Sequence, residues 1–296
     1  FKLNIKEIYM AQFKILSIDG GGIRGIIPSA ILSYIEKCIY PRSISDVFDL
    51  ITGTSTGGII TLGLSQPNQQ GTNKFTANDM LNLYLDHGDE IFLKRERDFV
   101  SKLTSLVEKV GFFFQKPYES KYLEKLFSEY FGDVSIKDCL TDILITTYDI
   151  HTNRPFYFSK RMALNNPVEN FKMKDVARAT SAAPTFFQPS IVKYDNLTQS
   201  FIDGGVFANN PSILAYAEGK ELWKRQHTLN FNPDVLPDDR DLPFLMLSLG
   251  TGKSKNSVSN NNGLNYRTKD WIEPLLSKIF MQSTALNNEY AIQHLL

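Results

Sequence analysis

The chain has 296 residues, and its proportions of hydrophobic (42%) and charged (22%) residues are typical of a folded globular protein. Lys plus Arg and Asp plus Glu each total 32, so the formal net charge is zero and the basic excess of a nucleic-acid-binding protein is missing. No apolar run approaches the roughly 18 residues that a membrane span needs, so we expect neither a nucleic-acid partner nor a transmembrane segment.

The predicted elements alternate between strands and helices along the chain. Short β-branched runs predict strands, and apolar residues three and four positions apart predict helices. This alternation predicts a layered α/β fold with a largely parallel sheet, in which ligands bind at the carboxyl ends of the strands. In chain order the expected elements are strand Phe13–Ile18, helix Pro28–Ile39, strand Val47–Thr52, an apolar helix ending near Leu64, helix Thr76–His87, helix Glu119–Tyr130, strand Ile143–Ile150, strand Pro155–Ser159, strand Gln199–Ile202, helix Ser212–Arg225, strand Phe244–Leu249 and helix Trp271–Leu296.

The sequence predicts one domain over residues 1–296. Residues 1–12 lack the continuous apolar centre and the cleavage site of a secretory signal, and we interpret them as an N-terminal extension. The helical pattern continues to Leu296, as expected of a truncated C-terminus. The polar stretches Asn230–Asp241 and Ser254–Gly263 do not separate two segments that could each hold a full set of elements.

The strongest local signal is Gly53-Thr54-Ser55-Thr56-Gly57, a G-x-S-x-G pattern between a predicted strand and a predicted helix. This is the context of a nucleophile elbow. Gly53 and Gly57 permit a tight turn and keep side chains away from the serine. The pattern favours Ser55 as a nucleophile at a helix N-terminus over a Gly-Ser turn without chemistry.

A serine hydroxyl needs a base within hydrogen-bond reach, and the sequence offers two kinds. The chain has four histidines, His87, His151, His227 and His294. His87 and His151 precede any plausible third member of a triad in chain order, His227 lies in a polar stretch at a helix end, and His294 lies near the end of the sequence. Asp203 follows a short strand and precedes Gly204 and Gly205, which leave its carboxylate uncovered. An Asp-Gly pair is usually only a turn, but because Ser55 needs a partner we favour Asp203 over a Ser-Asp-His triad with His227 or His294.

A second glycine-rich segment, Asp19–Gly25, also follows a strand and opens a helix. Successive glycine N–H groups at a helix N-terminus bind anions, here either a phosphate or the oxyanion of acyl transfer. The spacing matches a dinucleotide fingerprint, but the next strand runs into Gly53 instead of an acidic residue. Gly250–Ser254 is not a Walker A loop, because Leu247 stands where its first glycine belongs. We favour the oxyanion interpretation because it uses all the glycine segments at once.

Together these segments resemble the patatin-like phospholipase family over nearly the whole chain, from Ile15 to beyond Trp271. Five segments in the order of the family make the resemblance specific. They are Ser17–Gly25, Ile51–Gly58, Ala179–Phe187, Asp203–Gly205 and Leu247–Gly252. Plant patatins look nearer than the animal or bacterial branches, because Tyr84, His87–Gly88 and Asp149–Asn153 also resemble theirs.

The resemblance implies a three-layer α/β fold and a hydrolase of lipid acyl esters with a serine-aspartate dyad. Ser55 would be the nucleophile and Asp203 its base, without a histidine. A further set of residues would line the oxyanion hole, mainly through backbone N–H groups: Gly20, Gly21, Gly22 and Arg24. The remaining motif positions are Gly25, Gly53, Gly57, Gly204 and Gly205. Neither a cofactor nor a metal ion is implied.

The implied substrate is a phospholipid or glycolipid, reached at a membrane surface that the protein binds peripherally. We expect a cytoplasmic or peripheral membrane location; some bacterial relatives are delivered into host cells or need a protein activator. The stretch Asp98–Phe114 has apolar residues at helical spacing, and we favour packing on the core over insertion into an interface. The alternatives to a lipid hydrolase are a general carboxylesterase with a Ser-Asp-His triad and a non-catalytic storage or binding protein.

Overall fold

The computed structural model describes residues 13–88, 91, 120–184, 186–194, 197–228, 244–252 and 281–295. Several predicted segments lie outside these residues: the N-terminal extension 1–12, the stretch Asp98–Phe114, the loops Asn230–Asp241 and Ser254–Gly263, and the first part of the last predicted helix.

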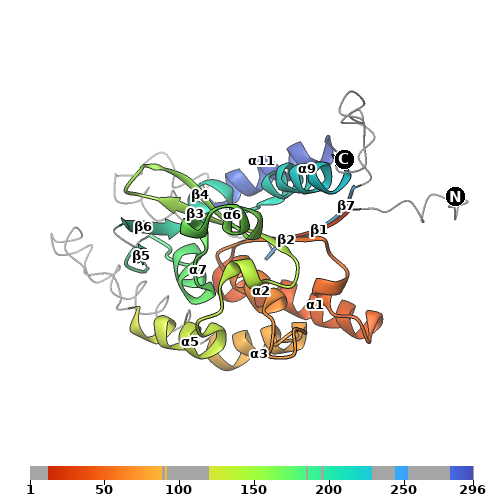
Figure 1. Cartoon of the computed structure of the whole chain (residues 1–296), viewed down its shortest axis with the longest axis horizontal. Helices are drawn as coiled ribbons and strands as arrows, with labels where there is room; N and C mark the ends of the chain where they lie inside the picture. Colours follow the sequence, from red (N-terminus) through yellow and green to blue (C-terminus); the bar gives the residue numbers. More distant parts are fainter. Residues whose placement is uncertain are drawn as a thin grey trace, which may run out of the picture.

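In the described residues a mixed sheet of seven strands forms the centre of the fold (Figure 1). Its order is β5-β6-β3-β2-β1-β7, and β4 also pairs with β3. Strands β7, β1, β2 and β3 are parallel to one another, whereas β4 and β6 run antiparallel to β3, and β5 antiparallel to β6. The strands are β1 Phe13–Ile18, β2 Leu50–Thr54, β3 Asp142–Asp149, β4 Arg154–Ser159, β5 Ser190–Tyr194, β6 Leu197–Asp203 and β7 Phe244–Leu249.

Helices cover both faces of this sheet. Helices α1, α2, α3, α5 and α7 lie on one side of it, and α9 and α11 lie on the other (Figure 1). The described helices are α1 Ile26–Ile39, α2 Thr56–Ser65, α3 Ala77–Gly88, α5 Lys121–Phe131, α6 Lys160–Asn165, α7 Met173–Thr180, α8 Gly205–Ala208, α9 Ser212–Thr228 and α11 Met281–Gln293, with the 3₁₀ turns η1 Gly22–Gly25, η2 Ile44–Asp46, η5 Ile136–Asp138 and η6 Pro167–Glu169. The predicted layered α/β class is confirmed.

Alternating side chains of β1 explain the layers, because successive residues of a strand point to opposite faces of the sheet. Phe13 and Ile15 belong to a small buried cluster with Trp223 of α9. Leu16 and Ile18 belong to the large cluster on the other face. Apolar residues therefore occupy both faces of the strand, as expected for a strand buried on both faces, with Lys14 and Ser17 as the only polar residues in it.

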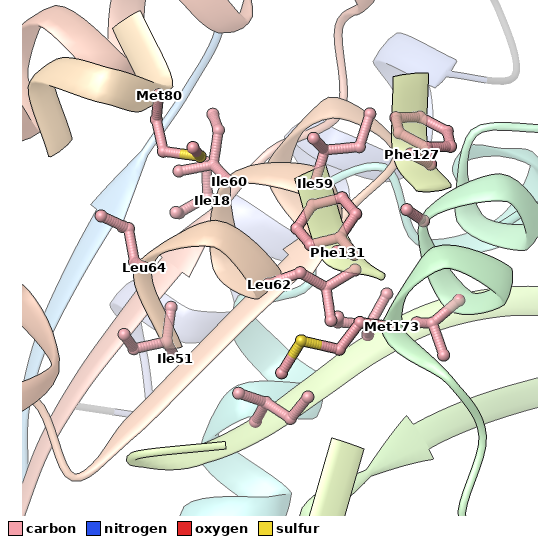
Figure 2. Close-up of a cluster of buried hydrophobic side chains, with 14 of the residues drawn as sticks. Ile18, Ile51, Ile59, Ile60, Leu62, Leu64, Met80, Phe127, Phe131 and Met173 are labelled. Carbon is pink, nitrogen blue, oxygen red and sulfur yellow. The ribbon is translucent and has the colours of Figure 1, made fainter. Parts of the chain in front are cut away.

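Helix α2 is the centre of the larger core, since all of its residues are buried. It carries no charged residue, so nothing opposes this burial. Figure 2 shows side chains of α2 meeting those of α3, α5, α7 and two strands. The labelled residues are Ile59, Ile60, Leu62 and Leu64 of α2, Met80 of α3, Phe127 and Phe131 of α5, Met173 of α7, Ile18 of β1 and Ile51 of β2. A fully buried α2 gives the residue just before it a rigid base.

The structure corrects some predicted boundaries. The sequence predicts a strand at Val47–Thr52, whereas β2 spans Leu50–Thr54, because the chain first forms the η2 turn. The strand predicted at Gln199–Ile202 extends from Leu197 to Asp203. Helix α7 and strand β5 are not predicted, since each is short and β5 is stabilised by its hairpin with β6.

Candidate active site

Ser55 lies in a sharp turn between β2 and α2, so the predicted order of strand, serine and helix is observed. Its backbone has φ 55° and ψ −119°. A positive φ is uncommon for a residue other than glycine, and such strain is often found at functional sites. The buried α2 and the sheet on either side hold the turn in this conformation.

The two glycines of the turn are required by close packing. A Cβ added to Gly57 would lie 2.2 Å from the carbonyl oxygen of Ile18, and one added to Gly53 would lie 2.2 Å from the carbonyl oxygen of Gly57. The turn therefore folds back on itself and presses against the end of β1. This contact brings Ser55 to the segment that follows β1.

We expect Gly57→Ala to lower the free energy of unfolding by roughly 1–3 kcal/mol, because the added methyl group meets a backbone oxygen that cannot swing aside. Chemical denaturation measures this loss. Gly250→Ala is the matched control, since among the described residues its Cβ would meet only the Asp19 carboxylate, at an ordinary 3.6 Å. A Gly57→Ala protein as stable as the wild type would contradict the tight packing described here.

The side chain of Ser55 is hydrogen-bonded to a buried carboxylate. Its Oγ donates to Oδ2 of Asp203 over 2.6 Å. Asp203 ends β6 and is 1% exposed, and its Oδ1 accepts from the backbone N–H of Gly205 over 2.7 Å. Burial raises the pKa of Asp203 to about 6, while the hydrogen bonds from Ser55 and Gly205 act in the opposite direction. The carboxyl group is therefore held in place and titrates close to neutral pH.

Buried threonine hydroxyls hold Ser55 and the residue before it in place. The N–H of Ser55 donates to Oγ1 of Thr180 over 2.8 Å, and that hydroxyl donates to the carbonyl of Thr146 over 2.8 Å. Thr54 donates to the carbonyl of Ala208 over 2.6 Å, which ties the serine turn to the helix that follows Asp203. These contacts fix the distance between Ser55 and its carboxylate.

The glycine-rich segment after β1 passes directly beside Ser55. A Cβ added to Gly20 would lie 3.3 Å from the Cβ of Ser55. The N–H of Gly20 donates to the carbonyl of Asn209 over 2.9 Å, and its carbonyl accepts from Oγ1 of Thr251 over 2.8 Å. Hydrogen bonds thus join the segments that contain Gly20, Asn209 and Thr251 beside Ser55.

The backbone N–H groups of Gly21 and Gly22 have no acceptor among the described residues. Gly22 has φ 59°, a conformation that favours glycine. The other two residues predicted for an oxyanion hole are engaged: the N–H of Gly20 by Asn209, and the N–H of Arg24 by the carbonyl of Gly21 over 3.2 Å. The exposed Arg24 guanidinium donates to the carbonyl of Gly252 over 3.2 Å.

The remaining motif glycines pack against neighbouring residues of the site. A Cβ on Gly204 would lie 2.2 Å from Oγ1 of Thr146, and one on Gly25 would lie 2.2 Å from Oγ1 of Thr56. Gly205 supplies the hydrogen bond to Asp203 described above. These positions are therefore structural supports of the Ser55 and Asp203 turns.

Sequence reasoning assigned no role to Thr180, Asn209 or Thr251, although each stands in or beside a glycine or family segment. Thr251 lies in the sequence that fails as a Walker A loop. Because β7 is parallel to β1, its carboxyl end places this threonine beside Gly20. The signal was present in the motifs, but the partner of each side chain depends on the strand order.

Among the described residues no imidazole contacts Ser55. His87 is hydrogen-bonded to a tyrosine hydroxyl over 3.0 Å, and His294 to a backbone carbonyl over 2.8 Å. His151 is exposed in the turn between β3 and β4, and the side chain of His227 lies outside the description.

The described part of the chain contains no group of three or more His, Cys, Asp and Glu residues that could hold a metal ion. Its helices are all too short or too polar to cross a membrane.

Comparison with known proteins identifies one family. The family model described as Patatin-like phospholipase matches residues 16–216. Patatin-like protein 2 of Arabidopsis thaliana is 34% identical over 287 residues, which cover 91% of this chain and 69% of that protein. Patatin-like protein 2 of Oryza sativa subsp. indica is 35% identical over 268 residues, which cover 86% of this chain and 63% of that protein. The match thus spans about two thirds of the length of these relatives.

Two further matches are more distant. "Probable inactive patatin-3-Kuras 1" of Solanum tuberosum is 31% identical over 297 residues, covering 93% of this chain and 73% of that protein. The crystal structure of VipD from Legionella pneumophila aligns at a TM-score of 0.36 and 10% identity, covering 96% of this chain and 66% of that one. A likeness of that size carries no argument about function.

Proposed function

Because this chain belongs to the patatin-like phospholipase family, we propose that it is a lipid acyl hydrolase in which Ser55 is the nucleophile and Asp203 its base. The observation that carries the proposal is the hydrogen bond of 2.6 Å from Ser55 Oγ to Asp203 Oδ2. A nucleophile and a base in such contact are the recurring feature of covalent catalysis by serine.

The reaction proceeds in two steps through an acyl-enzyme. Asp203 accepts the proton of Ser55 as Oγ attacks the ester carbonyl, and the lysolipid leaves with that proton when the tetrahedral intermediate collapses. Water then attacks the acyl-Ser55 ester, Asp203 accepts the water proton, and the fatty acid departs as the proton returns to Ser55. A carboxyl group with a pKa of about 6 is well matched to this role, since a general base works best near the operating pH.

The N–H groups of Gly21 and Gly22 are the proposed donors to the tetrahedral oxyanion. Both lack an acceptor in the described structure, and the neighbouring Gly20 packs against Ser55. In other enzymes the loss of one such donor costs about 3 kcal/mol of transition-state stabilisation. Gly20 and Arg24, whose N–H groups are engaged, would shape the loop rather than donate.

The proposed dyad predicts an acidic limit to the activity. Since Asp203 must be ionised to accept a proton, kcat/KM should reach half of its plateau near pH 6 and fall roughly tenfold per pH unit below that. The same raised pKa means that the folded state favours the protonated form of Asp203. The free energy of unfolding should therefore fall as the pH rises from about 4 to about 6. A rate profile on an ester that does not titrate in this range measures the limit.

Asp19, a second carboxyl group at this edge of the sheet with a raised pKa, provides the control. Burial, with a smaller effect of Glu289, raises the pKa of Asp19 to about 7. In Asp19→Asn the limit near pH 6 should remain. A wild-type profile that stays flat from pH 4 to pH 8 would exclude Asp203 as the base.

The proposed substrates are phospholipids or glycolipids, met at a membrane surface. To test this, wild type and Ser55→Ala are incubated with mixed phospholipid vesicles, and free fatty acid is measured by mass spectrometry. Release by the wild type alone would support a Ser55-dependent phospholipase, and the released chains would indicate the positional preference. Hydrolysis of a short nitrophenyl ester without release of fatty acid would favour a general esterase, and inactivity on both would favour a non-catalytic protein.

A further inference from the structure

Tyr84 of α3 is bonded to the residue that directly follows Ser55. It is 2% exposed. Its hydroxyl donates to the carbonyl oxygen of Thr56 over 3.1 Å and accepts from the Thr56 side-chain hydroxyl. Thr56 is itself buried and is the first residue of α2. The phenol thus binds the hydroxyl and the carbonyl of Thr56, and with them the first turn of the helix that presents Ser55.

Helix α3, which carries Tyr84, also contacts Gly25 at the C-terminal end of the glycine-rich segment. A Cβ added to Gly25 would lie 2.8 Å from the ring of Tyr84 and 2.2 Å from Oγ1 of Thr56. One turn further along α3, Gly88 lies so close to Ile23 that an added Cβ would be 2.3 Å from its Cδ1. Helix α3 therefore packs against η1. The N–H groups of Gly21 and Gly22 lie at the beginning of this turn.

From these contacts we infer that Tyr84 is a positioning residue that sets the spacing between the Ser55 hydroxyl and the oxyanion donors of the glycine loop. One side chain touches both halves of the site: its hydroxyl contacts the serine turn and its ring contacts the loop. The inference deepens the proposed function and rests on it. No other described side chain bonds both the hydroxyl and the carbonyl of Thr56.

Burial keeps this hydroxyl in the required state. It raises the pKa of Tyr84 well above its usual value, so the phenol stays protonated and can donate to the Thr56 carbonyl at any pH at which the enzyme works. The contribution of Tyr84 should therefore be independent of pH, unlike that of Asp203.

Tyr84→Phe tests the inference, because it removes the hydroxyl and leaves the ring against Gly25. We expect kcat on a nitrophenyl ester to fall between about tenfold and a hundredfold, since small displacements of a reacting group have effects of that size. KM and the pH limit should be unchanged, because the buried hydroxyl of Tyr84 bonds Thr56 and not Asp203. Rates are referred to the sites that a fluorophosphonate labels, so that misfolded protein does not count.

Two further variants separate positioning from general stability. Tyr122→Phe is the matched control, since it removes a phenol hydroxyl that bonds His87 over 3.0 Å, and it should leave kcat within twofold. Thr56→Val removes the partner hydroxyl. In the double variant with Tyr84→Phe, kcat should fall less than the two single losses combined, because both changes break one shared hydrogen bond.

A Tyr84→Phe enzyme with wild-type kcat per labelled site would overturn the inference, whether or not its unfolding midpoint had dropped. Losses that combine fully in the double variant would overturn it as well. Failure of the proposed function would look different: Ser55→Ala would then hydrolyse the ester as fast as the wild type.

Discussion

Replacing Ser55 with alanine is expected to reduce ester hydrolysis to the background rate while the chain stays folded. The nucleophilic oxygen is lost, and neither the Asp203 carboxylate nor the glycine loop can form the acyl-enzyme in its place. Loss of the nucleophile in another serine hydrolase lowers kcat by roughly 10⁶-fold, and we expect an effect near the detection limit. Hydrolysis of a nitrophenyl ester measures it.

The variant should fold because the substitution removes one hydrogen bond, that of the hydroxyl to Asp203, and leaves the bond of the Ser55 backbone N–H to Thr180. Circular dichroism and thermal unfolding check this. Ser33→Ala serves as the matched control: Ser33 is a buried serine of α1 whose hydroxyl bonds Asn78 over 3.2 Å, away from the site. Substantial turnover by a folded Ser55→Ala protein would remove Ser55 from the mechanism.

Asp203→Asn is expected to lower kcat by roughly 10⁴-fold, the size of effect seen when an acidic residue of a catalytic triad becomes an amide. The amide oxygen would keep accepting from the N–H of Gly205, so the amide NH₂ would face Ser55 Oγ. A donor in that place can neither orient the serine hydroxyl nor accept its proton. The steady-state rate at pH 8, where the wild-type carboxylate is fully ionised, gives the comparison.

His227→Ala separates the dyad from the alternative triad. If Asp203 acts directly as the base, the variant should keep its rate within twofold. A rate that collapses in His227→Ala and survives in Asp203→Asn would favour the carboxylesterase interpretation. The other histidines give no comparable test, since a ring nitrogen of His87 and of His294 is bonded elsewhere and His151 is exposed in the turn between β3 and β4.

The sequence predicted the central part of the fold because local signals there agree with the tertiary structure. The largely apolar segment Phe13–Ile18 predicts a strand without reference to its neighbours in the sheet. The segments Asp19–Gly25, Gly53–Gly57 and Asp203–Gly205 each follow a predicted strand and contain glycines that permit tight turns. The convergence of Asp19–Gly25, the Ser55 turn and Gly250–Gly252 follows from the parallel order of β1, β2 and β7. Parallel strands place their carboxyl ends at one edge.

The parts that were not predicted depend on contacts distant in sequence. The sequence predicted Asp203 as the partner of Ser55, but not the antiparallel direction of its strand, which places Asp203 in register with Thr147 of β3. The hydroxyl groups of Thr180 and Tyr84 bond the backbone on either side of Ser55. Threonine and tyrosine are ordinary residues of buried helices, so their sequence neighbours could not reveal these bonds.

The most direct test of the Ser55–Asp203 account is to trap the acyl-enzyme. Wild-type protein is mixed with a phospholipid, quenched in acid within milliseconds to seconds, digested and analysed by mass spectrometry. The account predicts a peptide containing Ser55 that is heavier by one fatty acyl group, formed quickly in the wild type, much more slowly in Asp203→Asn and never in Ser55→Ala. Fatty acid release with no adduct on Ser55, or with an adduct on another residue, would contradict it.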